Sequence, residues 1–355
     1  MRRTWTRFTG AAAALAVGAA ACGTSSGSTV SGGGKCVPTK TPVITFAAYS
    51  TPREVYGKII PAFQADWKEK HNGQNVIFQE SYGGSTTQAQ NVVNGFPADV
   101  VALSLAPDVD TIEQAGLITH DWTQAADGGM VSTSVVVFDV RPGNPKAITD
   151  WEDLTKPGVQ VLTPDPAQSG GARWNIVAAY GAAERGKAAR VVKGAAGALS
   201  LLTGVFSNVT VLDKSARDSI KNFESGNGDV ALTYENEVLT AQKARLPDQM
   251  VIPPSTVLIE NPVAVVDQNA EKHCVTDVAD AFVDFLHTQD AKDLYTSVGF
   301  LRPTNAADAA KGDGDTFAPI EDLFTVADLG GWDQIDQKVF GTAGIFTNAF
   351  KAAQG

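Results

Sequence analysis

Short apolar runs alternate along most of the chain with longer segments that have helical periodicity. The runs have the length and the content of β-branched residues that are typical of buried strands. They are Val43–Ala48, Val100–Leu105, Val135–Val140, Val159–Thr163, Val209–Leu212 and Val230–Tyr234. Strands that alternate with helices predict an α/β fold with largely parallel sheets.

The segment after the first apolar run has the pattern of an amphipathic helix. It opens with Thr51 and Pro52, a capping residue followed by a proline suited to the first helical turn. Apolar residues then recur at every fourth position, namely Val55, Ile59, Phe63 and Trp67. Such a stripe lies on one face of a helix and predicts packing against a core.

Two extended apolar segments, 134–142 and 259–267, are predicted to cross between two lobes. A chain of 355 residues is longer than a single core usually supports. The block between the crossings forms one lobe, and the parts before and after it share the other, which gives two Rossmann-like α/β lobes joined by a hinge. The expected boundaries are 41–133 with 267–330 for lobe I, 134–266 for lobe II with the hinge strands, and 331–355 for a C-terminal helical segment.

The N-terminus has the pattern of an export signal, which we place at 1–21. Three arginines precede an apolar run, Ala11–Ala21, that is too short to span a membrane. The alanines before Cys22 resemble a bacterial lipobox, in which that cysteine is lipidated, although Ala19 replaces the usual leucine. Ordinary cleavage near Ala21 is the alternative. A Gly/Ser/Thr-rich stretch, 22–40, follows and is expected to be a flexible tether.

The chain has three cysteines. Lipidation of Cys22 would use one of them and leave Cys36 and Cys274 as a pair. A disulfide between these two is permitted in an oxidising compartment. Two unpaired thiols are the alternative.

The formal net charge of −11 argues against a nucleic-acid partner or an anionic membrane surface. The same charge repels small anions at long range, so any anion site must work through local hydrogen-bond donors. The sequence has no paired-cysteine or H-E-x-x-H metal pattern. We therefore predict no metal and no cofactor. We also expect the protein to be a monomer.

Three segments combine Ser and Gly residues with the expected start of a helix: 81–87, 168–175 and 213–219. The first turn of a helix leaves backbone N–H groups without internal partners and carries a partial positive charge. Glycine lets an anion approach this backbone closely, and serine adds a hydroxyl donor. Simple helix capping explains each segment equally well when it is taken alone, so the pattern by itself leaves anion binding and capping open.

Four sets of short motifs lie in and near these segments: Ser81-Tyr82-Gly83-Gly84-Ser85, Thr163-Pro164-Asp165-Pro166 with Ser169-Gly170-Gly171-Ala172-Arg173-Trp174-Asn175, Val211-Leu212-Asp213 with Ala216-Arg217, and Gly228-Asp229-Val230 with Glu235-Asn236-Glu237. These motifs resemble those of the sulfate-binding proteins of ABC importers. The resemblance covers nearly all of the chain after the tether. It implies a type II periplasmic binding protein architecture and the capture of sulfate for a membrane permease.

The resemblance also implies which groups hold the anion. The backbone N–H groups are those of Ser85, Ser169, Gly170, Gly171 and Ala216, together with the hydroxyl of Ser169. Tyr234 stands where the family commonly has a tryptophan, and its hydroxyl either donates to the anion or only lines the cleft. The expected supporting residues are Gly84, Arg53, Arg173 and Arg217. These arginines either bond to peptide carbonyls behind the site or form ordinary ion pairs.

A site made only of donors suits sulfate, which has no proton at physiological pH. Protonated phosphate would meet a donor with its own O–H group. We therefore expect no carboxylate at the ligand, although Asp165, Asp213 and Glu235 are near in sequence. Thiosulfate, molybdate and tungstate are alternative ligands. An extracellular serine hydrolase is a more distant alternative, because the four histidines are scattered and none lies in the three segments.

Overall fold

The computed structural model describes Cys36 and residues 40–355. The predicted signal peptide, Cys22 and nearly all of the predicted tether lie outside the described residues. In the part that is described, no helix is long and apolar enough to cross a membrane.

The strands form a mixed sheet in which β4 and β9 are the longest members. The strands are β1 (Val43–Tyr49), β2 (Ile77–Gly83), β3 (Val100–Ala102), β4 (Met130–Val140), β5 (Val161–Pro164), β6 (Val209–Asp213), β7 (Val230–Tyr234), β8 (Gln249–Val251), β9 (Ser255–Val265) and β10 (Asp322–Phe324). Their order is β2-β1-β3-β9-β4-β7-β5-β6, and β10 pairs with β9 while β8 pairs with β4.

Each end of this order is a small parallel sheet, as the alternating pattern predicts. At one end β1 lies parallel to β2 and β3, and at the other end β5 lies parallel to β6 and β7. The central strands β4 and β9 pair with each other in antiparallel fashion. The fold is therefore the expected α/β arrangement of two parallel sheets joined by crossing strands.

The crossing strands connect the two ends because β9 pairs with β3 at one end, β4 pairs with β7 at the other, and the two pair with each other. In β4, the residues up to Val135 pair with β9, whereas Val136–Val140 pair with β7. In β9, Val263–Val265 pair with β3, on the other side. The crossings begin earlier than predicted, at Met130, where β4 already pairs with β9, and at Ser255, where β9 pairs with β10.

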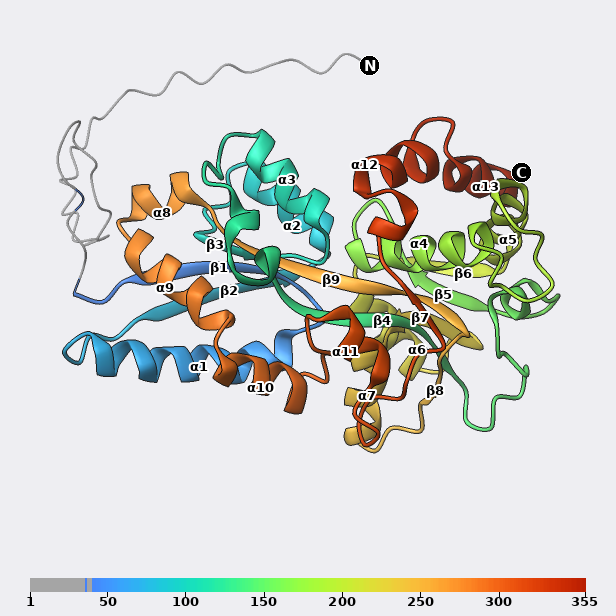
Figure 1. Cartoon of the computed structure of the whole chain (residues 1–355), viewed down its shortest axis with the longest axis horizontal. Coiled ribbons are helices and arrows are strands. Elements are labelled where there is room, and N and C mark those ends of the chain that lie inside the picture. Colours follow the sequence, from blue (N-terminus) through green and yellow to red (C-terminus); the bar gives the residue numbers. More distant parts are fainter. Residues whose placement is uncertain (1–35, 37–39) are drawn as a thin grey trace, which may run out of the picture. The chain divides into compact units, whose positions relative to one another are not determined.

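Helices surround both ends of the sheet (Figure 1). They are α1 (Arg53–Lys70), α2 (Ser85–Val93), α3 (Ala106–Gln114), α4 (Gly170–Glu184), α5 (Ala195–Ser207), α6 (Ala216–Glu224), α7 (Glu235–Lys243), α8 (Asp267–His273), α9 (Thr276–Leu286), α10 (Gln289–Ser297), α11 (Ala306–Lys311), α12 (Trp332–Ile335) and α13 (Ile345–Gln354). In Figure 1, α1, α8, α9 and α10 lie at the end that contains β1, whereas α4, α5, α12 and α13 lie at the other end.

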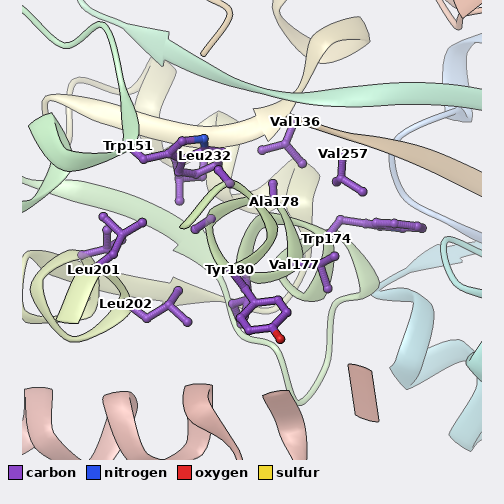
Figure 2. Packing of buried hydrophobic residues seen from close by; sticks show 14 of the residues in the cluster. Val136, Trp151, Trp174, Val177, Ala178, Tyr180, Leu201, Leu202, Leu232 and Val257 are labelled. Atoms are coloured by element: carbon purple, nitrogen blue, oxygen red, sulfur yellow. The ribbon is translucent and has the colours of Figure 1, made fainter. Parts of the chain in front are cut away.

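The predicted apolar stripe of α1 is buried in a core. Val55, Ile59, Phe63 and Trp67 are all at most 5% exposed and pack with residues of β1 and α9. At the other end, α4 is buried along nearly its whole length against β4, β7, β9 and α5 (Figure 2). Because α4 has so little freedom, its first turn has a fixed position.

The structure contains a disulfide between Cys36 and Cys274, whose Cα atoms are 5.4 Å apart. The bond attaches the start of the described chain to the residue after α8. Of the two alternatives for these cysteines, the structure has the paired one.

Candidate anion-binding site

The three Ser/Gly segments start α2, α4 and α6, and they meet at one place. A Cβ atom placed on Gly84, just before α2, would lie 2.4 Å from the carbonyl oxygen of Gln168 and 2.8 Å from that of Lys214. The backbone N–H of Thr87 donates to the same Gln168 carbonyl at 3.1 Å. The segment before α2 therefore touches both segments from the other end of the sheet.

A small cavity lies where the segments meet. Its volume is about 10 Å³, counted as the space open to the centre of a water molecule. The lining residues are Tyr49, Ser50, Thr51, Gly83, Gly84, Ser85, Ser104, Ser169, Gly171, Ala216 and Tyr234. None of these described lining residues is acidic, basic or a histidine. The cavity walls therefore offer hydroxyl groups and peptide groups.

Several backbone N–H groups at the helix starts are available to a ligand. Within the described part of the chain, those of Ser85, Gly170, Gly171 and Ala216 have no hydrogen-bond acceptor. Gly170 is not itself a lining residue, and it packs against Ser104. These groups lie in the first turns of three helices, where unpaired N–H groups and the helix dipole favour negative charge.

Ser169 offers its hydroxyl and not its backbone N–H. The N–H donates to the carbonyl of Asp165 at 2.8 Å, so in this structure it has a partner already, which differs from the sequence-based expectation. Ser169 lines the cavity and is 2% exposed. Its hydroxyl has no hydrogen-bond acceptor among the residues that the structure describes. The turn that starts at Asp165 explains why the N–H is occupied.

Asp108 supports the start of α2 from behind the cavity wall. The Ser85 hydroxyl donates to Asp108 at 2.5 Å and accepts from the backbone N–H of Ser104 at 2.9 Å. Burial raises the pKa of Asp108 to about 6, against the opposing effects of the Ser85 hydrogen bond and the charge of Arg173. Asp108 is not a lining residue, so the Ser85 hydroxyl separates its carboxylate from the cavity.

Ser104 is a site residue that the sequence analysis did not find. Its hydroxyl lies 2.6 Å from the hydroxyl of Tyr234, and its carbonyl accepts from the indole N–H of Trp174 at 2.7 Å. It thus joins the loop after β3 to β7 and α4. The sequence has two signals for it: Ser104 is the one polar residue of the apolar run Val100–Leu105, and Pro107 follows two residues after the expected strand end. Parallel strands end at a common edge, where ligands usually bind.

Tyr234 is 1% exposed and lines the cavity with its hydroxyl bonded to Ser104. Burial raises its pKa above the ordinary tyrosine value, so the phenol remains protonated. A protonated hydroxyl beside a second hydroxyl can direct one proton into the cavity. The geometry is therefore compatible with a donor and with a plain wall residue.

The three candidate arginines have different partners. Arg217 donates to the carbonyl of Thr51 at 3.0 Å and also pairs with Glu54 and Glu237 at 2.9 and 2.8 Å. Arg217 therefore combines the two alternatives, since it bonds to a peptide carbonyl and also forms ion pairs with carboxylates. Burial acts to raise the pKa of Glu54, but the Arg217 contact outweighs it and lowers the value.

Arg173 pairs with Asp336 and lies over the ring of Phe340 at 4.2 Å. Arg53 lies 5.2 Å from the centre of the Tyr82 ring. Neither of them bonds to a peptide carbonyl in the described part of the chain. Of the two alternatives for these arginines, Arg173 therefore has the ordinary ion pair, and Arg53 has neither the carbonyl contact nor an ion pair within the described residues.

The carboxylates that are near in sequence point to other partners. Asp165 accepts from Ala167 and Gln168, and Asp213 lies 3.3 Å from the side-chain nitrogen of Asn222. Glu235 forms a fully buried ion pair with Arg302 at 2.6 Å. None of these three described carboxylates lines the cavity.

The comparisons with known proteins define the class. Residues 44–301 match the family described as bacterial extracellular solute-binding protein. The chain therefore belongs to this family, whose members bind solutes and are not enzymes.

Particular relatives are also similar over most of the chain. The sulfate-binding protein of Synechococcus elongatus is 41% identical, covering 100% of this chain and 98% of the relative. The structure of the sulfate-binding protein SubI from Mycobacterium tuberculosis H37Rv matches with a TM-score of 0.72 at 37% identity, covering 83% of this chain and 98% of that one. The thiosulfate-binding protein of Pseudomonas aeruginosa is 34% identical, covering 85% of this chain and 90% of the relative.

Proposed function

We propose that this protein binds sulfate outside the cytoplasmic membrane and delivers it to an ATP-driven importer. The observation that carries the proposal is the cavity at three helix starts, lined by hydroxyl and peptide groups without a charged side chain among its described residues. The sulfate-binding relatives at about 40% identity support the same ligand.

Neutral donors suffice for a dianion when they are aligned before it arrives. Removing an ion from water is severely unfavourable unless a shell of hydrogen bonds replaces the lost hydration. The proposed shell consists of the N–H groups of Ser85, Gly170, Gly171 and Ala216, and the hydroxyls of Ser169 and Tyr234. A hydrogen bond to a charged group contributes about 1.5–3 kcal/mol after the exchange with water is counted, so several of them together give a favourable net free energy of binding.

The same arrangement selects against phosphate. Sulfate accepts hydrogen bonds at each oxygen, whereas phosphate near neutral pH retains at least one proton that needs an acceptor. Because the described cavity wall has no carboxylate, that proton would face a donor. A buried mismatch of this kind discriminates by up to about 10⁴ or 10⁵ in comparable sites.

The binding groups come from both sides of the crossing strands, so the anion favours a closed form. Ser85 precedes β4 in the chain, whereas Ser169 and Ala216 lie between β4 and β9. An open form exposes each set separately, and only the closed form engages both. This assignment fits lobe boundaries of 41–133 with 267–330, 134–266 for the second lobe, and 331–355 for the terminal helices.

We further propose that Cys22 carries a lipid that tethers the protein to the outer face of the membrane. The alanines before Cys22 and the Gly/Ser/Thr-rich stretch after it support this location. The importer permease would then contact the closed protein, which works as a monomer and has no nucleic-acid partner. Labelling with a radioactive or clickable fatty acid, with Cys22→Ser as the control, tests the anchor.

Titration calorimetry tests the ligand. The chain without its signal peptide is titrated with sulfate, thiosulfate, molybdate and phosphate at the same ionic strength. We expect the tightest binding with sulfate and no measurable heat of binding with phosphate. If molybdate or thiosulfate binds more tightly than sulfate, that anion and not sulfate is the ligand. If phosphate binds as tightly as sulfate, the site is not made only of donors.

A further inference from the structure

A second and larger pocket adjoins the sulfate cavity on its outer side. It has a volume of about 280 Å³ and shares Ser50, Gly83 and Gly84 with the inner cavity. Its other lining residues come from both sides of the crossing strands, with Tyr82 and Thr87 on one side and the start of α6 on the other. The two pockets are therefore separated by the segment around Gly84, which contacts Gln168 and Lys214.

The outer pocket differs from the inner one in its charge. Four cationic side chains line it, Arg53, Lys214, Arg217 and Lys221, against one carboxylate, Asp218. Asp218 already accepts a hydrogen bond from the Ser215 hydroxyl at 2.8 Å. The surplus of positive charge is local, because the whole chain has a formal charge of −11.

Three of these cations have no carboxylate partner. Arg217 pairs with Glu54 and Glu237, but Arg53, Lys214 and Lys221 form no ion pair with any residue that the structure describes. All three are exposed. Arg53 is held over the ring of Tyr82 at 5.2 Å, which keeps its charge at the pocket mouth.

We propose that this outer pocket is a vestibule that attracts oxyanions and holds them briefly before they enter the inner cavity. The proposal rests on the proposed function and adds a route to it. A dianion that approaches a net negative protein is repelled, and a local cluster of unpaired cations reverses that effect near the entrance. Capture and retention are thus divided between two sites, with cations outside and neutral donors inside.

Keeping the cations outside the inner cavity preserves the selectivity of that cavity. Lysine and arginine attract sulfate and phosphate alike, so cations in the inner cavity would weaken discrimination by proton content. Outside the cavity they raise the local concentration of all oxyanions and leave the choice to the donor shell. The vestibule therefore affects the association rate constant, and this effect depends on ionic strength.

Stopped-flow measurement of sulfate binding tests the vestibule, with the intrinsic tryptophan fluorescence as the signal, since Trp174 bonds to Ser104 of the cavity wall. The variant Arg53→Gln/Lys214→Gln/Lys221→Gln removes the unpaired cations. The control Lys68→Gln/Lys272→Gln/Lys351→Gln removes the same number of charges from exposed residues that form no ion pair within the described chain and do not line the pocket. Salt is raised from ~0.01 M to ~0.15 M, which shortens the Debye length from about 30 to about 8 Å.

We expect the vestibule variant to bind sulfate about tenfold more slowly than the control at low salt, with the difference shrinking as salt is added. Equal association rate constants for the two variants at low salt would overturn the vestibule. An unchanged association rate constant with faster release of sulfate would also overturn the vestibule, because it would mean that these cations contact the bound anion. If the wild-type protein does not bind sulfate in calorimetry, the proposed function itself fails, and the vestibule fails with it.

Discussion

The hydroxyl of Ser169 is the side-chain donor that is best placed to report on the bound anion. It is buried, lines the cavity and has no acceptor among the described residues. We predict that Ser169→Ala weakens sulfate binding by about 10- to 100-fold, because a hydrogen bond to a charged group is worth about 1.5–3 kcal/mol. Titration calorimetry measures the change.

Ser219→Ala is the matched control for that substitution. Ser219 is also buried, its hydroxyl also lacks a hydrogen-bond partner in the described structure, and it lies on α6 without lining the cavity. Its removal leaves sulfate affinity unchanged if the effect is specific to the cavity. Equal losses in the two variants would indicate a general packing effect and would remove Ser169 from the site.

Asp139 is a buried carboxyl group that the binding site does not use. It is 0% exposed, and neither of its oxygens has a hydrogen-bond partner in the described structure. Burial, followed by the charge of Asp248, raises its pKa to about 8. The folded protein therefore keeps a proton at this carboxyl group over a pH range in which the unfolded chain has lost it.

The raised pKa makes folding stability fall as the pH increases from about 4 to about 8. In that window unfolding releases the proton of Asp139, so a higher pH favours the unfolded chain. We predict that Asp139→Asn flattens the slope by up to about 1.4 kcal/mol per pH unit. Urea unfolding at several pH values measures it, and identical slopes for the two proteins would contradict the raised pKa.

The resemblance of the motifs to a known family implied that Ser85, Ser169 and Ala216 meet, whereas the local pattern of Ser/Gly helix starts alone left simple capping open. Neither of them predicted Ser104, whose role depends on where β3 ends relative to β7, a contact between residues far apart in sequence. The sequence also did not indicate which residue each arginine pairs with. Glu54 approaches Arg217, and Asp336 approaches Arg173, only in the folded chain. Local patterns thus identify donors, and tertiary contacts decide which donors remain unpaired.

At the scale of elements, most strands coincide with the apolar runs or the predicted crossings. Among the described strands β2, β8 and β10 do not, and β2 is the longest of these three. β2 (Ile77–Gly83) is at the edge of the sheet order, and none of its residues is fully buried. An edge strand that is not covered does not need an apolar run, so its sequence carries little strand signal. The crossing strands were found because they are buried along almost their whole length.

The contact between the start of α2 and the two opposing segments gives a test of closure. Gly84 has no room for a Cβ atom, since it would lie 2.4 Å from the backbone oxygen of Gln168. We predict that Gly84→Ala weakens sulfate binding more than tenfold, because the closed form becomes less populated and the apparent Kd rises in proportion. Calorimetry with sulfate measures this loss.

The neighbouring glycine provides the control. A Cβ atom on Gly83 would meet only the Gln88 side chain, at 3.7 Å, which is an ordinary contact. Although Gly83 lines the cavity, Gly83→Ala should therefore lose much less affinity for sulfate than Gly84→Ala. Thermal unfolding without ligand should be similar for both variants, and a large loss of stability in Gly84→Ala alone would attribute its effect to the fold instead of closure.

At the scale of the whole molecule, Arg217 ties the two sides of the site together. It lies on α6, and it contacts both Thr51 and Glu54 from the region around β1 and the start of α1. Opening would break these contacts but keep the pair between Arg217 and Glu237, which is on the same side as α6. The partly buried guanidinium therefore retains a partner in both forms, which keeps the energetic difference between the forms small.

The substitution Glu54→Gln should accelerate the release of sulfate by about two- to fivefold. Glu54 is partly exposed, so its pair with Arg217 contributes at most about 1 kcal/mol to the closed form. Glu69→Gln is the control, because Glu69 is exposed on the same helix and forms no ion pair within the described residues. Release rates from stopped-flow chase experiments measure the difference. Equal rates for the two variants would mean that the donor shell around the anion, and not the ion pair across the site, determines how long the closed form lasts.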